Sequence, residues 1–110
     1  MKVIYQLVGS DHTTTLLENC VNKIYSYQTD WLKFFLQDYH AYKYINVKLR
    51  NLLTDDLILQ TMIDSTNKYD PLPLFKIQVS DYGGLEHNVE YCLSVWMNGT
   101  TFHFKFMIKK

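Results

Sequence analysis

The chain has 110 residues, of which 47% are hydrophobic and 20% are charged, and its formal net charge is zero. This balance excludes a disordered chain, and the length fits one domain over residues 1–110. It also disfavours a nucleic-acid partner, because duplex binders usually carry a basic excess and this chain has a single arginine, Arg50.

The first half of the chain predicts a strand followed by two helices. Residues 2–8 carry apolar side chains on both faces, which is typical of a strand, and residues 9–11 supply a turn. A helix is expected to begin at Thr15, because Glu18 completes a capping box, and apolar residues recur at helical spacing up to Ile24. A second helix is expected from Thr29 to Tyr42, with an aromatic stripe that includes the side chains Trp31, Phe34 and Phe35. No glycine or proline separates the two segments, so one long bent helix is the alternative.

The aromatic side chains of residues 25–44 exceed what one helix face needs for a core, since the segment holds eight aromatic residues in twenty. Most of them are expected to be core. The remaining tyrosines, Tyr25, Tyr42 and Tyr44, are candidate anchors for a partner, because tyrosine is favoured at interfaces.

The middle of the chain is less regular. Apolar and polar residues alternate over residues 44–49, which favours a strand, although the segment also fits a continued helix. Residues 54–56 read as the start of a third helix, with Asp55 and Asp56 near the positive end of its dipole. The residue before Pro71 is expected to end that helix.

The last third predicts antiparallel strands. Residues 75–79 alternate in strand fashion, residues 82–84 form a turn, and Asn98-Gly99 is a strong signal for a two-residue hairpin turn. A turn there sets the register, in which the expected pairs are Met97 with Thr100, Val95 with Phe102, Leu93 with Phe104, Tyr91 with Phe106 and Val89 with Ile108.

These large apolar pairs define one face that should pack against the helices. The predicted fold class is therefore α+β: an antiparallel sheet, made of the C-terminal hairpin and the N-terminal strand, covered on one face by two or three helices. The opposite hairpin face carries polar residues and a tryptophan. The predicted protein-binding residues are Trp96, His103, Lys105 and Met107 on this face, together with Tyr82 in the adjoining loop.

Two alternatives accompany this site. In the first, another element such as the loop of residues 82–88 covers the hairpin face, and the face is not free to bind. The final strand lacks an obvious cover, so Lys105, Lys109 and Lys110 either guard a sheet edge or leave it open to a partner strand, including a strand of a second copy in a homodimer.

No catalytic, metal or cofactor site is predicted. The histidines are scattered, and the nearest approaches to a metal pair, Asp11 with His12 and Asp38 with His40, are explained as solvated or capping groups. Asp55 and Asp56 are explained as helix caps rather than as paired catalytic carboxylates. Cys20 and Cys92 lack metal spacing and are expected to be buried free thiols in a reducing cytoplasm.

The sequence also predicts a protein without a membrane segment or signal peptide, since its apolar runs are short. The function expected from these features is a small non-enzymatic protein-binding module. It would inhibit or adapt a host or competitor protein, in the manner of the anti-defence, immunity or host-takeover factors of phages and mobile elements. The alternative is a ribonuclease toxin of a toxin–antitoxin pair, on the coarse order of a strand, two helices and three strands.

Overall fold

The chain forms two packed β-sheets in a computed structural model, which describes residues 1–40, 44–66, 70–80 and 83–110. Nine strands and no helix are found among these residues, so the α+β prediction is wrong and the fold is all-β. The strands are β1 (Lys2–Leu7), β2 (Thr14–Thr15), β3 (Val21–Tyr25), β4 (Trp31–Gln37), β5 (Tyr44–Asn51), β6 (Leu57–Asp64), β7 (Leu72–Gln78), β8 (Glu90–Met97) and β9 (Thr100–Lys109).

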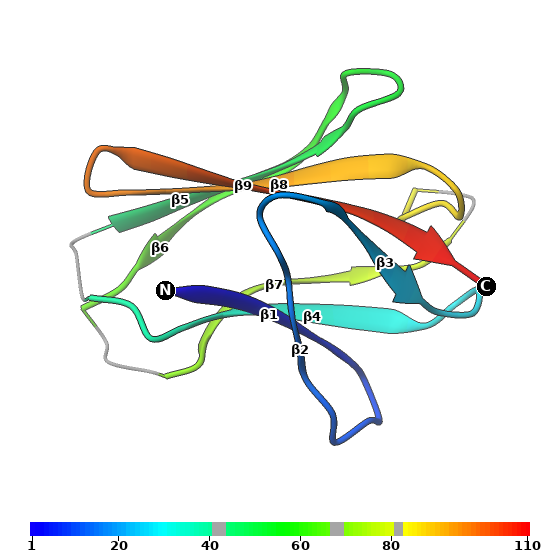
Figure 1. Cartoon of the computed structure of the whole chain (residues 1–110), viewed down its shortest axis with the longest axis horizontal. Helices are drawn as coiled ribbons and strands as arrows, with labels where there is room; N and C mark the ends of the chain where they lie inside the picture. The colour runs from blue at the N-terminus through cyan, green and yellow to red at the C-terminus, as the bar shows by residue number, and fades with distance from the viewer. Residues whose placement is uncertain (41–43, 67–69, 81–82) are drawn as a thin grey trace.

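The strands form two layers, which are seen edge-on in Figure 1. The smaller sheet has the order β2-β1-β4-β7, and the larger sheet has the order β3-β9-β8-β5-β6. All named pairs are antiparallel except β3 with β9, which run parallel. The N-terminal strand therefore lies in the sheet opposite the C-terminal hairpin, and not beside it as the sequence predicted.

The two predicted helices of the first half are strands instead. In β4 the side chains alternate strictly, with Leu32, Phe34 and Leu36 buried and Trp31 and the other intervening residues at least partly exposed. A strand accommodates this because β-branched and aromatic residues favour extended backbone, and the whole chain contains one alanine. The helical stripe was an incidental match, since residues 31, 34 and 35 also fit a period of 3.6.

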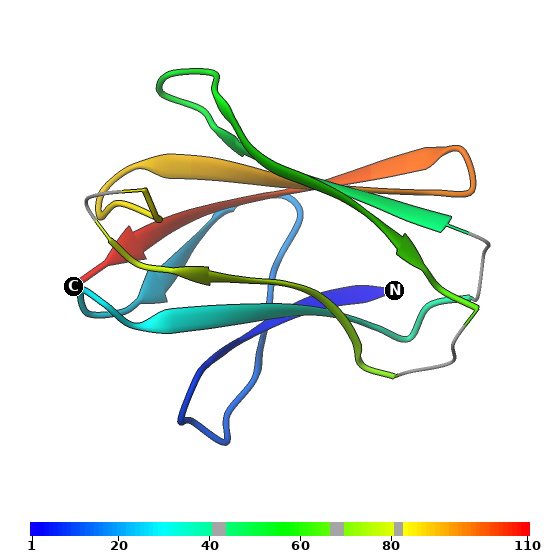
Figure 2. The ribbon, with the colours of Figure 1, turned by 180° about the vertical axis from the view of Figure 1, so that it is seen from behind.

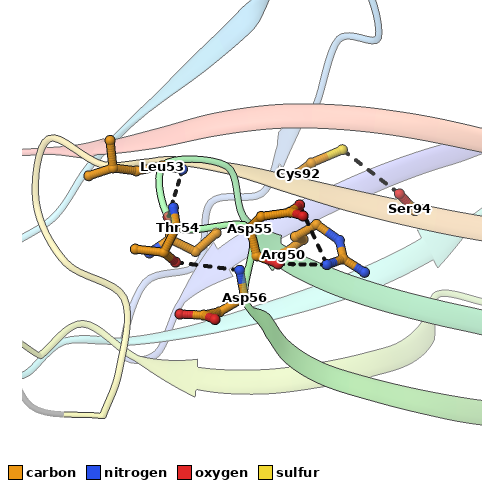
Figure 3. A network of polar contacts seen from close by, with 8 residues as sticks. Arg50, Leu53, Thr54, Asp55, Asp56, Cys92 and Ser94 are labelled. Carbon is orange, nitrogen blue, oxygen red and sulfur yellow. Dashed lines mark hydrogen bonds and ion pairs between the residues drawn. The ribbon is translucent and has the colours of Figure 1, made fainter.

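The third predicted helix, from Thr54, is also wrong, because residues 52–56 turn the chain from β5 into β6. The Asn51 side chain accepts hydrogen bonds from the backbone N–H groups of Leu53 and Thr54, at 2.9 and 3.2 Å. Figure 3 shows Arg50 closing the turn: its Nη1 donates to the Asp55 carbonyl oxygen at 2.7 Å. Asp55 adopts a positive φ of 63°, which a helix does not allow.

The predicted opening strand is confirmed as β1, and the predicted strands of the last third are confirmed as β7, β8 and β9. The predicted turn of residues 82–84 begins at Tyr82, which lies outside the described residues. Residues 44–49 lie in β5, which resolves the open choice in favour of a strand. The hairpin β8–β9 has the predicted register for the four pairs from Met97–Thr100 to Tyr91–Phe106, whereas the predicted Val89–Ile108 pair lies beyond the end of β8. Asn98 and Gly99 both have positive φ, as the two-residue turn requires.

The large apolar face of the hairpin packs against the second sheet and not against helices. Phe34 of β4 is buried in the core. Its ring centroid lies 4.7 Å from that of Phe75 on the neighbouring strand β7, and 5.5 Å from that of Phe106 on β9 in the opposite sheet. Tyr91 stacks on Phe106 at 5.6 Å. The core thus joins β4 and β7 of the smaller sheet to β8 and β9 of the larger one.

The final strand is not a sheet edge, which corrects the predicted route to a homodimer through it. β9 lies between β8 and β3, and the pairs from Val21–Lys105 to Tyr25–Lys109 cover its outer side over residues 105–109. Lys105 and Lys109 therefore guard no edge.

The strand order resembles that of immunoglobulin-type sandwiches. β4 lies beside β7 in one sheet and β9-β8-β5 lie together in the other, as the corresponding strands do there. Tyr91, at the start of β8, accepts a hydrogen bond from the backbone N–H of Glu86 at 2.7 Å, which is the geometry of a tyrosine corner. Buried Leu93 stands at the position of the cysteine two residues later, so the core has hydrocarbon where those domains have a disulfide. Such a likeness describes the fold and carries no function.

Candidate functional site

The outward side chains of the larger sheet form the candidate site, which we call the outer sheet face. Each central strand of this sheet buries every second residue, so the intervening residues point away from the core. The residues of the outer sheet face are Val21, Lys23 and Tyr25 of β3, Tyr44, Asn46, Lys48 and Arg50 of β5, Gln60, Met62 and Asp64 of β6, Glu90, Cys92, Ser94 and Trp96 of β8, and Thr101, His103, Lys105, Met107 and Lys109 of β9.

Trp96 is the largest exposed group on the hairpin part of this face, with 44% of its surface exposed. Strand pairing places it in one row with Thr101, Asn46 and Met62, because Trp96 pairs with both Thr101 and Asn46, and Asn46 pairs with Met62. Met62 is 63% exposed and Tyr44 is 44% exposed. Three large side chains from three strands therefore project from one part of the face.

These side chains surround a depression of about 390 Å³, whose lining residues are Tyr44, Asn46, Lys48, Met62, Ser94, Trp96 and Thr101. Tyr44, Met62 and Trp96 supply its apolar surface, and Asn46, Lys48, Ser94 and Thr101 supply its polar groups. The Asn46 side-chain oxygen is buried here and accepts no hydrogen bond from any residue that the structure describes. A buried acceptor without a donor costs free energy, so a ligand that supplied an N–H or O–H would gain from it.

The electrostatic character of the outer sheet face is basic although the whole chain is neutral. Lys23, Lys48, Arg50, Lys105 and Lys109 project from it, against the two carboxylates of Asp64 and Glu90. Asp55 partly neutralises Arg50, with 3.6 Å between the guanidinium and the carboxylate. In the described parts of the chain no carboxylate lies within ion-pair distance of Lys48 or Lys105. The face therefore presents positive charge beside its apolar groups.

Ser94, His103 and Cys92 form the nearest thing to a reactive cluster. Ser94 Oγ lies 2.8 Å from His103 Nδ1, and Cys92 Sγ lies 3.9 Å from the same nitrogen. Figure 3 shows Cys92 and Ser94, with 3.8 Å between their sulfur and oxygen atoms. A hydroxyl beside an imidazole begins a nucleophile–base pair, but catalysis also needs a group that orients the base and donors for an oxyanion.

The first requirement is not met among the described residues, because no hydrogen-bond partner is found there for His103 Nε2. The backbone of β8 is engaged in ladders with β5 and β9 on its two sides, whereas β9 pairs with β3 only over residues 105–109. No group of three metal-ligating side chains is found in the described ranges either. Ser94 and His103 are therefore a cross-strand hydrogen-bonded pair.

The structure brings four of the five sequence-predicted binding residues onto one face. Trp96, His103 and Lys105 are exposed and Met107 is half-buried. Tyr82 lies outside the described residues. The alternative, that a loop covers this face, does not hold for Trp96, whose exposed fraction is that of a surface residue.

Sequence reasoning missed the half of the depression that β5 and β6 supply. The signal for β5 is present, because Tyr44, Asn46 and Lys48 alternate with buried residues. The same residues also fit a continued helix, however, and nothing local in the sequence places the strand beside β8. Met62 was assigned to a helix. Among the surplus tyrosines, Tyr44 lines the depression, Tyr25 is 64% exposed on β3, and Tyr42 lies outside the described residues.

The two cysteines are free, as predicted, but not both buried: Cys20 is exposed and Cys92 is half-buried. In the part of the chain that is described, no helix is long and apolar enough to cross a membrane. Comparison of the chain with protein-family models, curated proteins and solved structures finds no match.

Proposed function

We propose that the protein is a non-enzymatic binding module that recognises another protein through the outer sheet face. The observation that carries the proposal is the depression between Trp96, Tyr44 and Met62. Tryptophan, tyrosine and methionine are enriched at the centres of protein interfaces, where they give large contact areas at low entropic cost. Three such side chains around one depression match an interface centre better than an ordinary solvated face.

The charge of the face specifies the partner further. Lys48 and Lys105 lie on either side of Ser94 and His103 without ion pairs in the described residues. Positive groups around an apolar centre complement a partner that presents an apolar side chain ringed by carboxylates. The partner is therefore an acidic protein surface, and association should weaken as salt is added.

The origin and the compartment expected from the sequence are part of this proposal. A small inhibitor or adaptor encoded by a phage or mobile element fits a compact module with one binding face. Free Cys20 and Cys92 support a reducing compartment such as the cytoplasm. The ribonuclease alternative loses its basis, because it depended on two helices in the chain order and both segments are strands.

Trp96→Ala and Trp31→Ala make a matched pair for the test. Trp31 is 41% exposed, close to the 44% of Trp96, but it lies on β4 in the smaller sheet. Immobilised wild type and both variants would be exposed to extract from the organism that encodes the chain, and the captured proteins quantified by mass spectrometry. One acidic protein should bind wild type and Trp31→Ala in stoichiometric amount and be lost from Trp96→Ala.

Lys48→Glu is a second test. It removes a positive charge from the outer sheet face, so it should reduce capture of the acidic partner and the dependence of that capture on salt. Equal capture by all the variants, or a partner that only Trp31→Ala loses, would contradict the proposed face. Toxicity on expression that disappears in His103→Ala would favour the ribonuclease instead.

A further inference from the structure

The edges of the two sheets differ in how they are protected. The smaller sheet ends at β2, which has two residues, and at β7, which contains Pro73 and Lys76. The larger sheet ends at β3, which has five residues including Lys23, and at β6. Short strands, proline and lysine are the usual devices that prevent an edge from pairing with another chain.

β6 has none of these devices. It runs for eight residues, LILQTMID, without proline or a basic residue, and its one charge is Asp64 at the end. Figure 2 shows it running across the outside of the larger sheet. Among the residues that the structure describes, no strand pairs with its free side.

The backbone of β6 offers hydrogen-bonding groups at that free side. The Asn51 N–H donates to the Asp56 carbonyl oxygen on the β6 side, whereas the Leu52 N–H donates to the Glu90 carbonyl oxygen on the β8 side. The backbone N–H and C=O groups of odd-numbered residues in β5 therefore point towards β6. Their partners in β6 include Thr61, which therefore points back towards β5. The backbone N–H and C=O groups of Gln60 and Met62, between these residues, point outward.

The side chains of β6 are also incompletely buried. None of its eight residues is fully buried, although the neighbouring strand β5 buries three residues and β8, the next strand beyond β5, buries four. Leu59 and Ile63 pack only partly against the core, and Leu57 and Met62 are 44% and 63% exposed. A further strand along this edge would cover these apolar groups and satisfy the backbone together.

We infer that a second copy of the chain supplies this strand, with the two β6 strands antiparallel about a two-fold axis at Thr61. Thr61 then faces Thr61 of the second copy. Gln60 faces Met62 and Leu59 faces Ile63, each twice by symmetry. Residues on the same face of the sheet meet in every pair, and the outward backbone groups of residues 60 and 62 meet in the hydrogen-bonded pairs.

The charge of β6 favours this occupant and this direction. In the antiparallel pairing Asp64 faces residue 58 of the second copy, so the two carboxylates lie at opposite ends of the pair. Parallel pairing in register would put them side by side. An identical strand, uncharged over residues 57–63, matches the edge over its length. The acidic partner proposed for the outer sheet face is instead attracted to the lysines of the other strands.

Two-fold pairing closes the assembly, because the β6 edge of each copy is used up by the β6 edge of the other. The two larger sheets become one sheet of ten strands, with the depressions beside Trp96 on the same side. The inference goes beyond the proposed function and does not depend on it, since the dimer forms without the partner.

Sedimentation of the purified chain measures the association directly. A strand pair buries less than the roughly 800 Å² per partner of a standard interface, so loadings from about 10 µM to about 1 mM are needed. The mass should rise from monomer to dimer and stop there. Gln60→Pro removes an outward N–H without touching the β5 ladder, and it should hold the chain as a folded monomer at every loading.

Met62→Lys and Tyr25→Lys form the matched control. Both residues point outward from an edge strand of the larger sheet, and their exposed fractions are 63% and 64%. Met62→Lys should weaken the dimer at least tenfold, and Tyr25→Lys and Trp96→Ala should leave it unchanged. Thr61→Cys in a chain with Cys20→Ser and Cys92→Ser should form a disulfide-linked dimer on mild oxidation, and Gln60→Cys should not.

A monomer at all loadings would overturn the inference, as would a dimer that survives Gln60→Pro or is lost with Tyr25→Lys. Growth beyond a dimer would overturn the two-fold closure. A folded monomer that still captures the acidic partner through Trp96 would overturn this inference alone, and leave the proposed function standing.

Discussion

Phe34→Ala and Phe35→Ala separate the sandwich from the helix that the sequence predicted for this segment. Phe34 is 1% exposed and its ring contacts Tyr5, Phe75 and Phe106. Removing a buried phenylalanine costs about 3–5 kcal/mol, out of about 5–16 kcal/mol expected for a chain of this length. Phe35 is half-buried on the opposite side of β4, so its removal should cost about 1–2 kcal/mol.

Urea unfolding followed by tryptophan fluorescence measures both losses. A difference of about 2 kcal/mol corresponds to about 1.5 M in the midpoint, at a slope near 1.3 kcal/mol/M. If Phe34→Ala does not fold, Phe34→Leu and Phe35→Leu should keep the same order with smaller losses. Equal losses at the two positions would refute the alternation, because a helix with residues 34 and 35 on one buried stripe predicts that result.

Three further predictions concern the corner, the hairpin and the thiols. Tyr91→Phe leaves the Glu86 N–H without its acceptor and should cost about 1–2 kcal/mol in urea unfolding. Burial raises the pKa of the Tyr91 phenol above its ordinary value of 10.0, so this group stabilises the fold fully below pH 10 and less as pH rises through the folded pKa. The difference in unfolding free energy between wild type and Tyr91→Phe should therefore shrink above pH 10. A constant difference would contradict the raised pKa. Gly99→Ala should cost roughly 1 kcal/mol in thermal unfolding, because its φ of 79° strains any residue with a Cβ, and no loss would contradict the turn. Exposed Cys20 should react with a thiol reagent faster than half-buried Cys92, and the reverse order in a peptide map would count against the described burial.

The sequence predicts the C-terminal hairpin well, because its signals are local. The Asn98-Gly99 turn fixes the register, and strict alternation on both strands assigns each side chain to a face, so Trp96, His103 and Lys105 were placed together correctly. Their role in binding stays a prediction.

The first half of the chain could not be predicted in the same way. β3 lies beside β9, and β1 beside β4, so these strands depend on partners far along the chain. The aromatic residues 31, 34 and 35 fit both the helical period of 3.6 and the strand period of 2. The choice between helix and strand then depends on composition, and a chain with one alanine and many β-branched and aromatic residues favours strands. The depression was missed for the same reason, because Tyr44 and Met62 meet Trp96 only once β5 lies between β6 and β8.

Every proposal depends on β4 and β9 facing one another across a common core. Nuclear Overhauser effects between the ring protons of Phe34 and Phe106 test this most directly, since their centroids are 5.5 Å apart and the two residues belong to different sheets. The sandwich predicts strong cross-peaks between these rings, together with the extended backbone pattern over residues 31–37. Sequential amide–amide contacts over residues 31–37, with no contact between the two rings, would contradict it.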